Sequence, residues 1–377
     1  MLDLIREFRV GRPQIFAGCL LLFFLFQCLW VATSRRFSDL EYEYIASGFP
    51  TRPGQEFHVT SPATGVIAAA PVRLLASMRN VLSPSMKASL AIPRPWLIRL
   101  PFIIFGLWLG GAIWWVARRL FGNDGGYIAL ALYCFSPAMV MISSNIGPEI
   151  ILAWSGFGLI YTAIGVAHTV YAPPKKWIPR ILILGTAIGI CISTALWAFT
   201  WALLALAFMI YLAPGQRRRV FIVLSGSLII GLITLAVFHW LTGSVGLGSR
   251  ALILPHPTLD LVRNLGFAFA DGRLFAALFV AALVVYGSWS RCRYFGNTAP
   301  LLTAFAAVLL FALVPAIYLW DATLGLSFAF IFIGGVAADL LELPSRRLIL
   351  RVLAAMIVLR AVLGISLLYG WTHPNPL

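Results

Sequence analysis

Long apolar runs recur along this chain, and they constrain its fold more than any other feature. The first is IFAGCLLLFFLFQCLWVAT at residues 15–33, and comparable runs follow throughout the sequence. A run of about 18 or more apolar residues is long enough to cross the hydrocarbon core of a membrane as an α-helix. Because backbone polar groups in lipid must be satisfied within the segment itself, the sequence predicts an all-α, polytopic bundle of transmembrane helices.

The apolar runs and the loops between them predict about eleven transmembrane helices. Composition agrees with this class, since 61% of the residues are hydrophobic and only 11% are charged. The first run is expected to be retained, because it is longer than the roughly 7–15 apolar residues of a signal peptide. The expected ranges are 15–33, 98–117, 125–143, 149–170, 179–195, 197–213, 220–241, 274–290, 299–319, 323–341 and 349–370.

The basic residues give this helix layout an orientation. With the N-terminus in the cytoplasm, more than half of the 28 Lys and Arg residues fall on the inner side, as the positive-inside rule requires. The net charge of +15 is therefore mainly a topology signal, and no nucleic-acid partner is expected. The inner set is Arg6, Arg9, Arg12, Arg118, Arg119, Lys175, Lys176, Arg180, Arg217, Arg218, Arg219, Arg291, Arg293, Arg346, Arg347 and Arg351.

Many of the acidic residues gather on the opposite, outer face. Most of these acids lie in two long outer segments, 34–97 and 242–273. We therefore expect a multi-pass integral membrane protein of the bacterial inner membrane, with its polar chemistry on the extracytoplasmic face. The outer acids are Asp39, Glu41, Glu43, Glu56, Glu149, Asp260, Asp271 and Asp321.

The first outer segment contains two stretches with the spacing of helices that lie on a membrane surface. They are SDLEYEYIASGF at 38–49 and SPATGVIAAAPVRLLASMRN at 61–80. Pro62 lies near the start of the second helix, where its missing N–H costs nothing. Arg73 is expected to reach for water or for lipid headgroups from the polar side of this helix.

Four motifs in the first half of the chain follow one another in a distinctive order. SDLEYEYIA comes after the first helix, and HVTSPATGVIAAAPVRLL introduces the second surface helix. RLPFIIFGLWLGGAIWWVARRLFGNDGGYIALALYCFSP then supplies two helices joined by RRLFG, and ISSNIGPEIILAW opens the next helix with Pro-Glu. In this order the motifs resemble the GT-C superfamily of polytopic membrane glycosyltransferases, over about residues 15–170.

The resemblance implies both an organisation and a function. A GT-C-like transmembrane module would cover 1–241, including the outer loop 34–97, and a variable module would cover 242–377, with the outer loop 242–273. The implied activity is an inverting glycosyl transfer from a polyprenyl-phosphate donor to an acceptor at the extracytoplasmic face. The expected partners are this lipid-linked sugar and the membrane lipids.

The acids of the first outer loop are the candidates for catalysis. In the resembled enzymes a loop carboxylate acts as general base on the acceptor. Asp39 is the first candidate because it lies nearest the end of the first helix, and Glu41 is the second. The family often has adjacent Asp and Glu, which Leu40 separates here, so both assignments stay open. Glu43 lies one helical turn after Asp39 and is expected to contact substrate, with a solvated acidic face as its alternative.

Five further residues are candidates for holding substrate. Glu149 opens a predicted helix, where it either stabilises the helix dipole or holds the acceptor. Arg250, His256 and Arg263 lie in the second outer segment, and the planar guanidinium groups suit phosphate oxygens. His58 precedes the second surface helix. A contact with lipid headgroups or a plain surface position is the alternative for each of these basic residues.

The sequence requires no cofactor. The five cysteines have no metal-ligand spacing, and no disulfide framework is expected. Mg²⁺ and Mn²⁺ prefer carboxylate oxygens. If such a divalent cation takes part, Asp39 and Glu149 are the pair expected to hold it.

Two other functions fit the same composition. The chain is short for the superfamily, which is compatible with a non-catalytic GT-C-like scaffold or a lipid-carrier-binding subunit of a larger complex. A transporter would show matching interrupted helices in its two halves, and the sequence has no such pair. Confinement of these acids to one face also argues against a path through the membrane.

One arginine, Arg360, lies in the middle of the last apolar run. A charge that faces lipid there would cost about 2.5–3.5 kcal/mol on insertion scales. We therefore expect Arg360 either to face the interior of the bundle or to extend toward the membrane surface.

The odd number of predicted spans places the two ends of the chain on opposite sides of the membrane. A reporter fused after Leu377 is expected to be extracytoplasmic, so an alkaline phosphatase fusion should be active and a green fluorescent protein fusion dark. The same reporters fused after Arg219 should give the opposite pattern. A cytoplasmic reporter at Leu377 would contradict the helix count.

Overall fold

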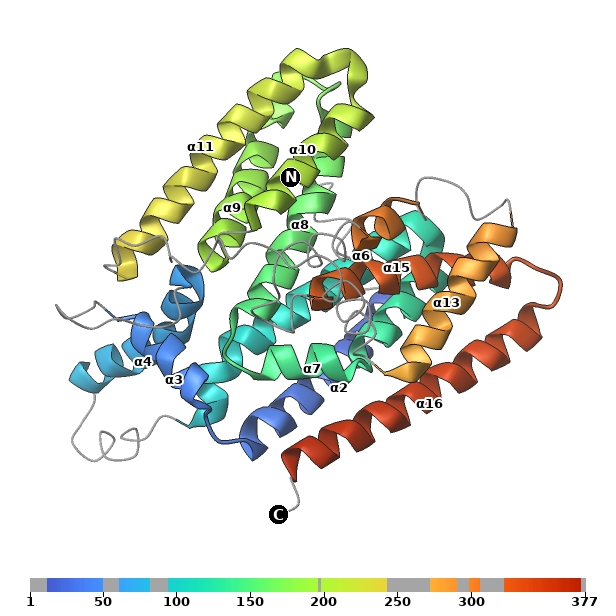
Figure 1. Cartoon of the computed structure of the whole chain (residues 1–377), viewed down its shortest axis with the longest axis horizontal. Coiled ribbons are helices and arrows are strands. Elements are labelled where there is room, and N and C mark those ends of the chain that lie inside the picture. The colour runs from blue at the N-terminus through green and yellow to red at the C-terminus, as the bar shows by residue number, and fades with distance from the viewer. Residues whose placement is uncertain are drawn as a thin grey trace, which may run out of the picture.

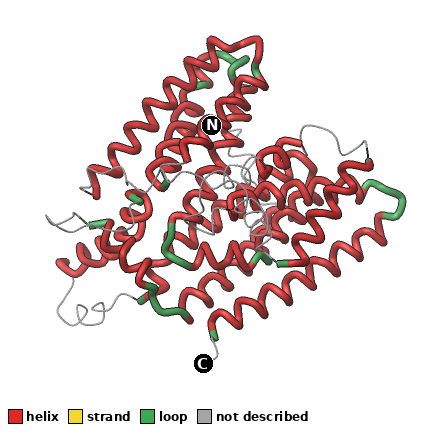
Figure 2. The backbone as a smooth tube through the Cα atoms, in the orientation of Figure 1, coloured by secondary structure: helices red, strands yellow, loops and turns green. Residues whose placement is uncertain are grey.

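The computed structural model describes seven stretches of the chain, and almost all of them are helical. Within these stretches no strand occurs, so the predicted all-α class is confirmed (Figure 2). The described residues are 12–49, 61–81, 94–195, 198–242, 272–289, 298–305 and 322–373.

Twelve of the labelled elements in these stretches are α-helices, and Figure 1 shows their arrangement. They are α2 (Arg12–Ser34), α3 (Asp39–Ser47), α4 (Pro62–Val81), α6 (Pro95–Cys134), α7 (Pro137–Ser144), α8 (Pro148–Thr169), α9 (Ile178–Thr194), α10 (Phe199–Leu212), α11 (Arg217–Thr242), α13 (Arg273–Ser288), α15 (Ala322–Leu341) and α16 (Arg346–Thr372).

Six helical stretches in the described part of the chain are long and apolar enough to cross a membrane. α10, α13 and the 325–341 part of α15 are shorter apolar helices at other predicted positions. Each predicted span thus has a helical counterpart, although only 298–305 of the span expected at 299–319 is described. The six long stretches are Pro13–Ser34, Pro95–Cys134, Pro148–Thr169, Pro174–Thr194, Pro214–Thr242 and Arg346–Thr372.

The long helix α6 is a hairpin with two antiparallel arms. The chain turns at Gly122, whose φ of +74° is a left-handed conformation that glycine adopts without strain. The Tyr133 hydroxyl donates to the Gly106 carbonyl at 2.6 Å, although 27 residues separate the two. In one straight helix these residues would lie about 40 Å apart. The two arms correspond to the predicted spans 98–117 and 125–143.

The second arm of this hairpin differs from the prediction because it stops at Cys134. Pro137 has no N–H to donate, and it begins the short helix α7 in a new direction. The last turn of α6 tightens, so the Ser136 N–H bonds the Tyr133 carbonyl. The Cys134 carbonyl instead accepts from the Gln27 side chain of α2 at 3.0 Å. We call residues 135–137 the α6–α7 break.

The two surface helices lie together at one end of the bundle (Figure 1). Ser61, just before α4, donates to the Thr194 carbonyl at the end of α9, at 2.7 Å. Both stretches are helical as predicted, since α3 begins at Asp39 and α4 at Pro62, and their place on the membrane surface stays a prediction. We call the end formed by α3, α4, the start of α6 and the turn at 145–147 the site end.

One cluster of buried apolar side chains runs through the described helices. It includes Phe24 and Phe157 from the first predicted module and Phe275 and Phe328 from the second. The core is therefore shared across the predicted boundary at residue 242, and the division into two modules stays a prediction.

A close contact between α6 and α15 gives a stability prediction. A Cβ atom on Gly334 of α15 would lie 2.8 Å from the Gly125 carbonyl oxygen of α6. Gly334→Ala should therefore destabilise the bundle by about 1–3 kcal/mol, as overpacking does. Gly111→Ala, on α6 with open space around the same added atom, should leave the thermal midpoint in detergent unchanged or slightly raised. Equal midpoints for both variants would contradict this packing.

Candidate functional site

The start of α3 is fixed by hydrogen bonds between Ser38 and Glu41. The Ser38 hydroxyl accepts from the Glu41 N–H at 3.3 Å, and the Ser38 N–H donates to Glu41 Oε2 at 2.9 Å. This reciprocal pair is a capping box, which satisfies two backbone donors at a helix start. The Glu41 side chain is therefore held against the beginning of its own helix.

A buried ion pair joins this helix start to α6. Arg99 Nε donates to Glu41 Oε1 at 2.9 Å, and Arg99 Nη2 donates to Glu41 Oε2 at 2.8 Å. The two side chains are only 1% and 6% exposed. The pair is bidentate, which is the strongest geometry that an arginine and a carboxylate can form.

Arg99 also binds the end of α2. Its two terminal nitrogens donate to the carbonyls of Ala32, Arg35 and Arg36 at 2.8–2.9 Å. The last carbonyls of a helix have no partner within the helix, so these bonds cap α2. With the two bonds to Glu41, all five guanidinium donors are used.

Glu41 reaches a third element through a backbone bond. Its Oε1 accepts from the Ile146 N–H at 3.0 Å, in the turn between α7 and α8. Each Glu41 oxygen thus accepts two hydrogen bonds. Since its lone pairs are committed to holding helix ends together, Glu41 is poorly available to take a proton from an acceptor. We call this arrangement of Glu41, Arg99 and their partners the junction.

The other two acids of α3 are placed differently. Asp39 is the first residue of the helix and is exposed. In the part of the chain that the structure describes, Asp39 makes no ion pair. Glu43 is half-buried, and its Oε2 atom is buried with no hydrogen-bond partner among the described residues. Asp39 is therefore the acid of α3 that is most open to a ligand.

Glu149 lies in the first turn of α8, where the helix dipole stabilises a carboxylate. Its side chain folds back over Gly147, because a Cβ atom there would lie 2.0 Å from Glu149 Oε2. Glu149 follows Ile146 by three residues, so the turn that bonds Glu41 also positions this second carboxylate. The structure thus brings the α3 acids and Glu149 to the two sides of one junction.

Four further residues are predicted to contact substrate. His58, Arg250, His256 and Arg263 lie outside the described residues. Just before the second outer segment, the Leu241 carbonyl of α11 accepts a hydrogen bond from Arg73 of α4 at 3.3 Å.

Arg73 binds backbone carbonyls of the protein, where the sequence predicted contact with water or lipid headgroups. It also donates to the Gly48 carbonyl, and its guanidinium lies 5.5 Å from the centre of the Phe49 ring. These contacts tie the end of α3 to α4 and to the end of α11. Arg73 therefore acts as a clamp between three elements.

The described residues contain no group of three or more His, Cys, Asp or Glu side chains that could hold a metal ion. Asp39 and Glu149 remain the predicted pair for a divalent cation.

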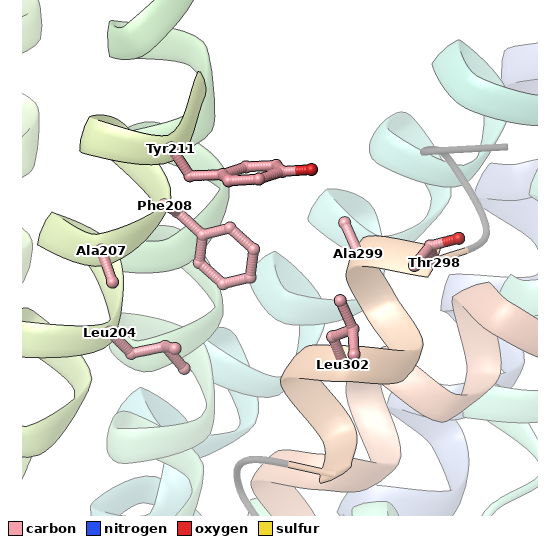
Figure 3. A pocket seen from close by; sticks show the side chains of 7 residues that line it. All are labelled: Leu204, Ala207, Phe208, Tyr211, Thr298, Ala299 and Leu302. Atoms are coloured by element: carbon pink, nitrogen blue, oxygen red, sulfur yellow. The ribbon is translucent and has the colours of Figure 1, made fainter. Parts of the chain in front are cut away.

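A groove of about 230 Å³ lies between α10 and the helix at 298–305 (Figure 3). No charged side chain lines it and most of its lining side chains are apolar, so it suits hydrocarbon. Its lining residues are Leu204, Ala207, Phe208, Tyr211, Thr298, Ala299 and Leu302.

Sequence reasoning missed Arg99 as a site residue, although a local signal was present. Arg99 lies in the second turn of α6, which begins at Pro95. A cation near a helix N-terminus is disfavoured by the helix dipole. An arginine at such a position in an apolar helix therefore needs an anionic partner, and Glu41 is that partner.

Comparison with known proteins relates this architecture to membrane glycosyltransferases. Residues 86–242 match the family described as dolichyl-phosphate-mannose-protein mannosyltransferase. The search of curated proteins found no match.

Solved structures are similar over most of this chain. ArnT from Cupriavidus metallidurans bound to undecaprenyl phosphate has a TM-score of 0.62 and 14% identity, covering 86% of this chain and 59% of ArnT. The apo form of that protein gives 0.59 and 13%, with the same coverage. The Archaeoglobus fulgidus oligosaccharyltransferase in complex with Zn and sulfate gives 0.56 and 13%, covering 92% of this chain and 52% of that protein.

These likenesses establish the fold. The chain is an integral membrane protein with the GT-C fold, as its motifs predicted. It spans between half and three fifths of the length of the solved structures that it matches.

The junction gives a stability prediction. Arg99→Met leaves Glu41 buried without its cation, which typically costs about 3–5 kcal/mol, so the thermal midpoint in detergent should fall by roughly 10 °C. Arg94→Met removes an exposed arginine just before the same helix and should change the midpoint by less than about 2 °C. A similar small change in both variants would show that the buried pair does not hold the site end together.

Proposed function

We propose that this chain is an inverting glycosyltransferase that moves a sugar from a polyprenyl-phosphate donor to an acceptor at the extracytoplasmic membrane face. The observation that carries the proposal is an exposed Asp39 held beside a rigid junction in a GT-C fold. The donor class is supported by the ArnT structure, which was solved with undecaprenyl phosphate.

Asp39 is proposed as the general base. The acceptor hydroxyl oxygen would attack the anomeric carbon while its proton passes to the Asp39 carboxylate. The bond from the anomeric carbon to the phosphate oxygen breaks, and the polyprenyl phosphate leaves as an anion that needs no general acid. One positioned base typically contributes about 10²–10⁴-fold to the rate.

The neighbouring acids are proposed in supporting roles. Glu41 acts as a positioning residue through the junction, because its four hydrogen bonds fix the first turn of α3. Glu149 and Glu43 are proposed to hold the acceptor. If Mg²⁺ or Mn²⁺ takes part, Asp39 and Glu149 would be its carboxylate ligands.

The outward orientation of the site end is supported by the distribution of basic residues. Arg118, Lys175, Arg217 and Arg346 lie at helix ends away from α3 and α4, as the alternation of helices along the chain requires. The positive-inside rule assigns that end to the cytoplasm. We propose that Arg250, His256 and Arg263 of the second outer segment, together with His58, bind the donor phosphate on the opposite side.

A non-catalytic, lipid-carrier-binding scaffold is the second candidate function. The observation that favours it is the full commitment of Glu41 to the junction, which leaves Asp39 as the one exposed acid of α3. Such a scaffold would bind the lipid carrier without turning it over.

Single substitutions in full-length protein in lipid nanodiscs separate these roles. With undecaprenyl-phosphate-linked radiolabelled sugars as donors, Asp39→Asn should lower turnover about 10²-fold or more, because it keeps size and removes basicity. Binding of undecaprenyl phosphate should change less than twofold. Glu43→Gln should lower turnover less than tenfold, and Asp124→Asn, an exposed control away from the site end, should leave it unchanged.

Three outcomes would redirect the proposal. Equal losses for the Asp39 and Glu43 variants, or a large loss in Glu41→Gln with none in Asp39→Asn, would show that the base is misassigned. Wild-type protein that binds undecaprenyl phosphate but turns over no sugar donor would favour the scaffold.

A further inference from the structure

The last helix, α16, lies along the edge of the bundle (Figure 1). Most of its side chains face outward, and Val358 and Val362 are 61% and 59% exposed. Arg360, between them, is only 3% exposed. The sequence left open whether this arginine faces the bundle or the membrane surface, and the structure turns it into the bundle.

Arg360 makes two kinds of contact there. Its Nε and Nη2 atoms both donate to the Leu132 carbonyl of α6, at 3.3 and 3.2 Å. Its guanidinium lies 4.9 Å from the centre of the Phe275 ring and 5.7 Å from that of Phe330. Rings at these distances attract a guanidinium through their negative faces. Arg360 thus links α16 to α6, α13 and α15.

The Leu132 carbonyl is available because of the α6–α7 break. In an uninterrupted helix it would accept from the Ser136 N–H, but that N–H bonds Tyr133 instead. A backbone carbonyl with no partner inside a membrane costs several kcal/mol. Arg360 supplies the missing donor from the last helix of the chain.

A second residue of α16 fits the same break. Gly364, one helical turn after Arg360, lies so close that an added Cβ would be 3.0 Å from the Phe135 carbonyl oxygen. Arg360 and Gly364 therefore form one face of α16 that seats on residues 132–137.

The break in turn leads to the site end. α7 runs from Pro137 to Ser144 and is followed by Ile146, whose N–H donates to Glu41 in the junction. On the opposite side, α2 holds the break through Gln27 and the Cys134 carbonyl. The position of the turn at 145–147 therefore depends on how α6 and α7 are held at the break.

We propose that Arg360 is a positioning residue, which fastens α16 onto the α6–α7 break and thereby fixes the turn at 145–147. The attachment of α16 to the break is inferred only from the contacts of Arg360 and Gly364. Its importance for turnover rests on the proposed function, so the attachment and the turnover are tested by separate measurements.

Native cysteines report on the fastening directly. Cys28 and Cys134 are fully buried beside the break, while Cys191 is fully buried in α9 and Cys19 is exposed. Full-length protein in lipid nanodiscs is treated with N-ethylmaleimide, and the rate of modification at each cysteine is followed by peptide mass spectrometry. Arg360→Met should raise the rates at Cys28 and Cys134 at least tenfold and that at Cys191 less than twofold.

Three further variants complete this test. Arg360→Lys keeps a donor and a positive charge but loses the planar guanidinium, so it should restore only part of the protection. Gly364→Leu should open the break with Arg360 still present, because its side chain has no room against Phe135. Arg351→Met removes an exposed arginine from the same helix and should change none of the rates. Unchanged protection in Arg360→Met, or an equal rise at all three buried cysteines, would overturn the fastening.

Turnover tests the second part. Arg360→Met should lower kcat at least tenfold with little change in KM, because the contacts of Arg360 are with α6, α13 and α15 and not with the predicted site residues. Arg360→Lys should recover part of this loss. Faster modification of Cys28 and Cys134 in Arg360→Met with an unchanged kcat would overturn the positioning role. No turnover in wild-type protein would refute the proposed function and leave the cysteine result intact.

Discussion

The site end of this protein depends on the buried pair of Glu41 and Arg99. A buried ion pair is weak evidence for stability, because desolvation offsets much of the attraction between the charges. Here every donor of Arg99 and both oxygens of Glu41 are used, so seven hydrogen bonds compensate the desolvation of the two charges. The pair therefore fixes the ends of α2, α3, α6 and the turn before α8 relative to one another.

The same physical need explains the other long-range polar contacts. Inside a membrane each interruption of a helix leaves carbonyl groups that water cannot reach. The Gln27 side chain of α2 donates to the Cys134 carbonyl, and Arg360 of α16 donates to that of Leu132. The α6–α7 break is therefore held by two helices that are distant from it in sequence. Arg73 likewise donates to the Gly48 carbonyl at the end of α3. Polar side chains in this apolar chain thus mark the places where helices end.

The sequence predicted the helices better than the polar contacts, for a physical reason. Apolar length and turn residues report on local backbone, so α2, α3, α4 and α8 were expected close to their observed positions. The α6–α7 break was missed because the run through 125–143 stays apolar and only Pro137 interrupts it. Arg99 was missed because its partner lies 58 residues away, and no periodicity reports such a distance. For Arg360, the sequence left two positions open, the bundle interior and the membrane surface. The packing of α6, α13 and α15 around its side chain places it in the interior.

The division of roles among the acids of α3 follows from their place in the helix. Ser38 and Glu41 are spaced as a capping box, in which the N-cap side chain and the third helical residue bond backbone groups at the helix start. Asp39 is the first residue of the helix, between these two, and its side chain takes no part in the capping box. The spacing Ser-Asp-Leu-Glu therefore already separates a committed acid from an available one. An acid in that first position is carried by a rigid helix start yet keeps its own oxygens for a ligand, which is the combination that a positioned base requires.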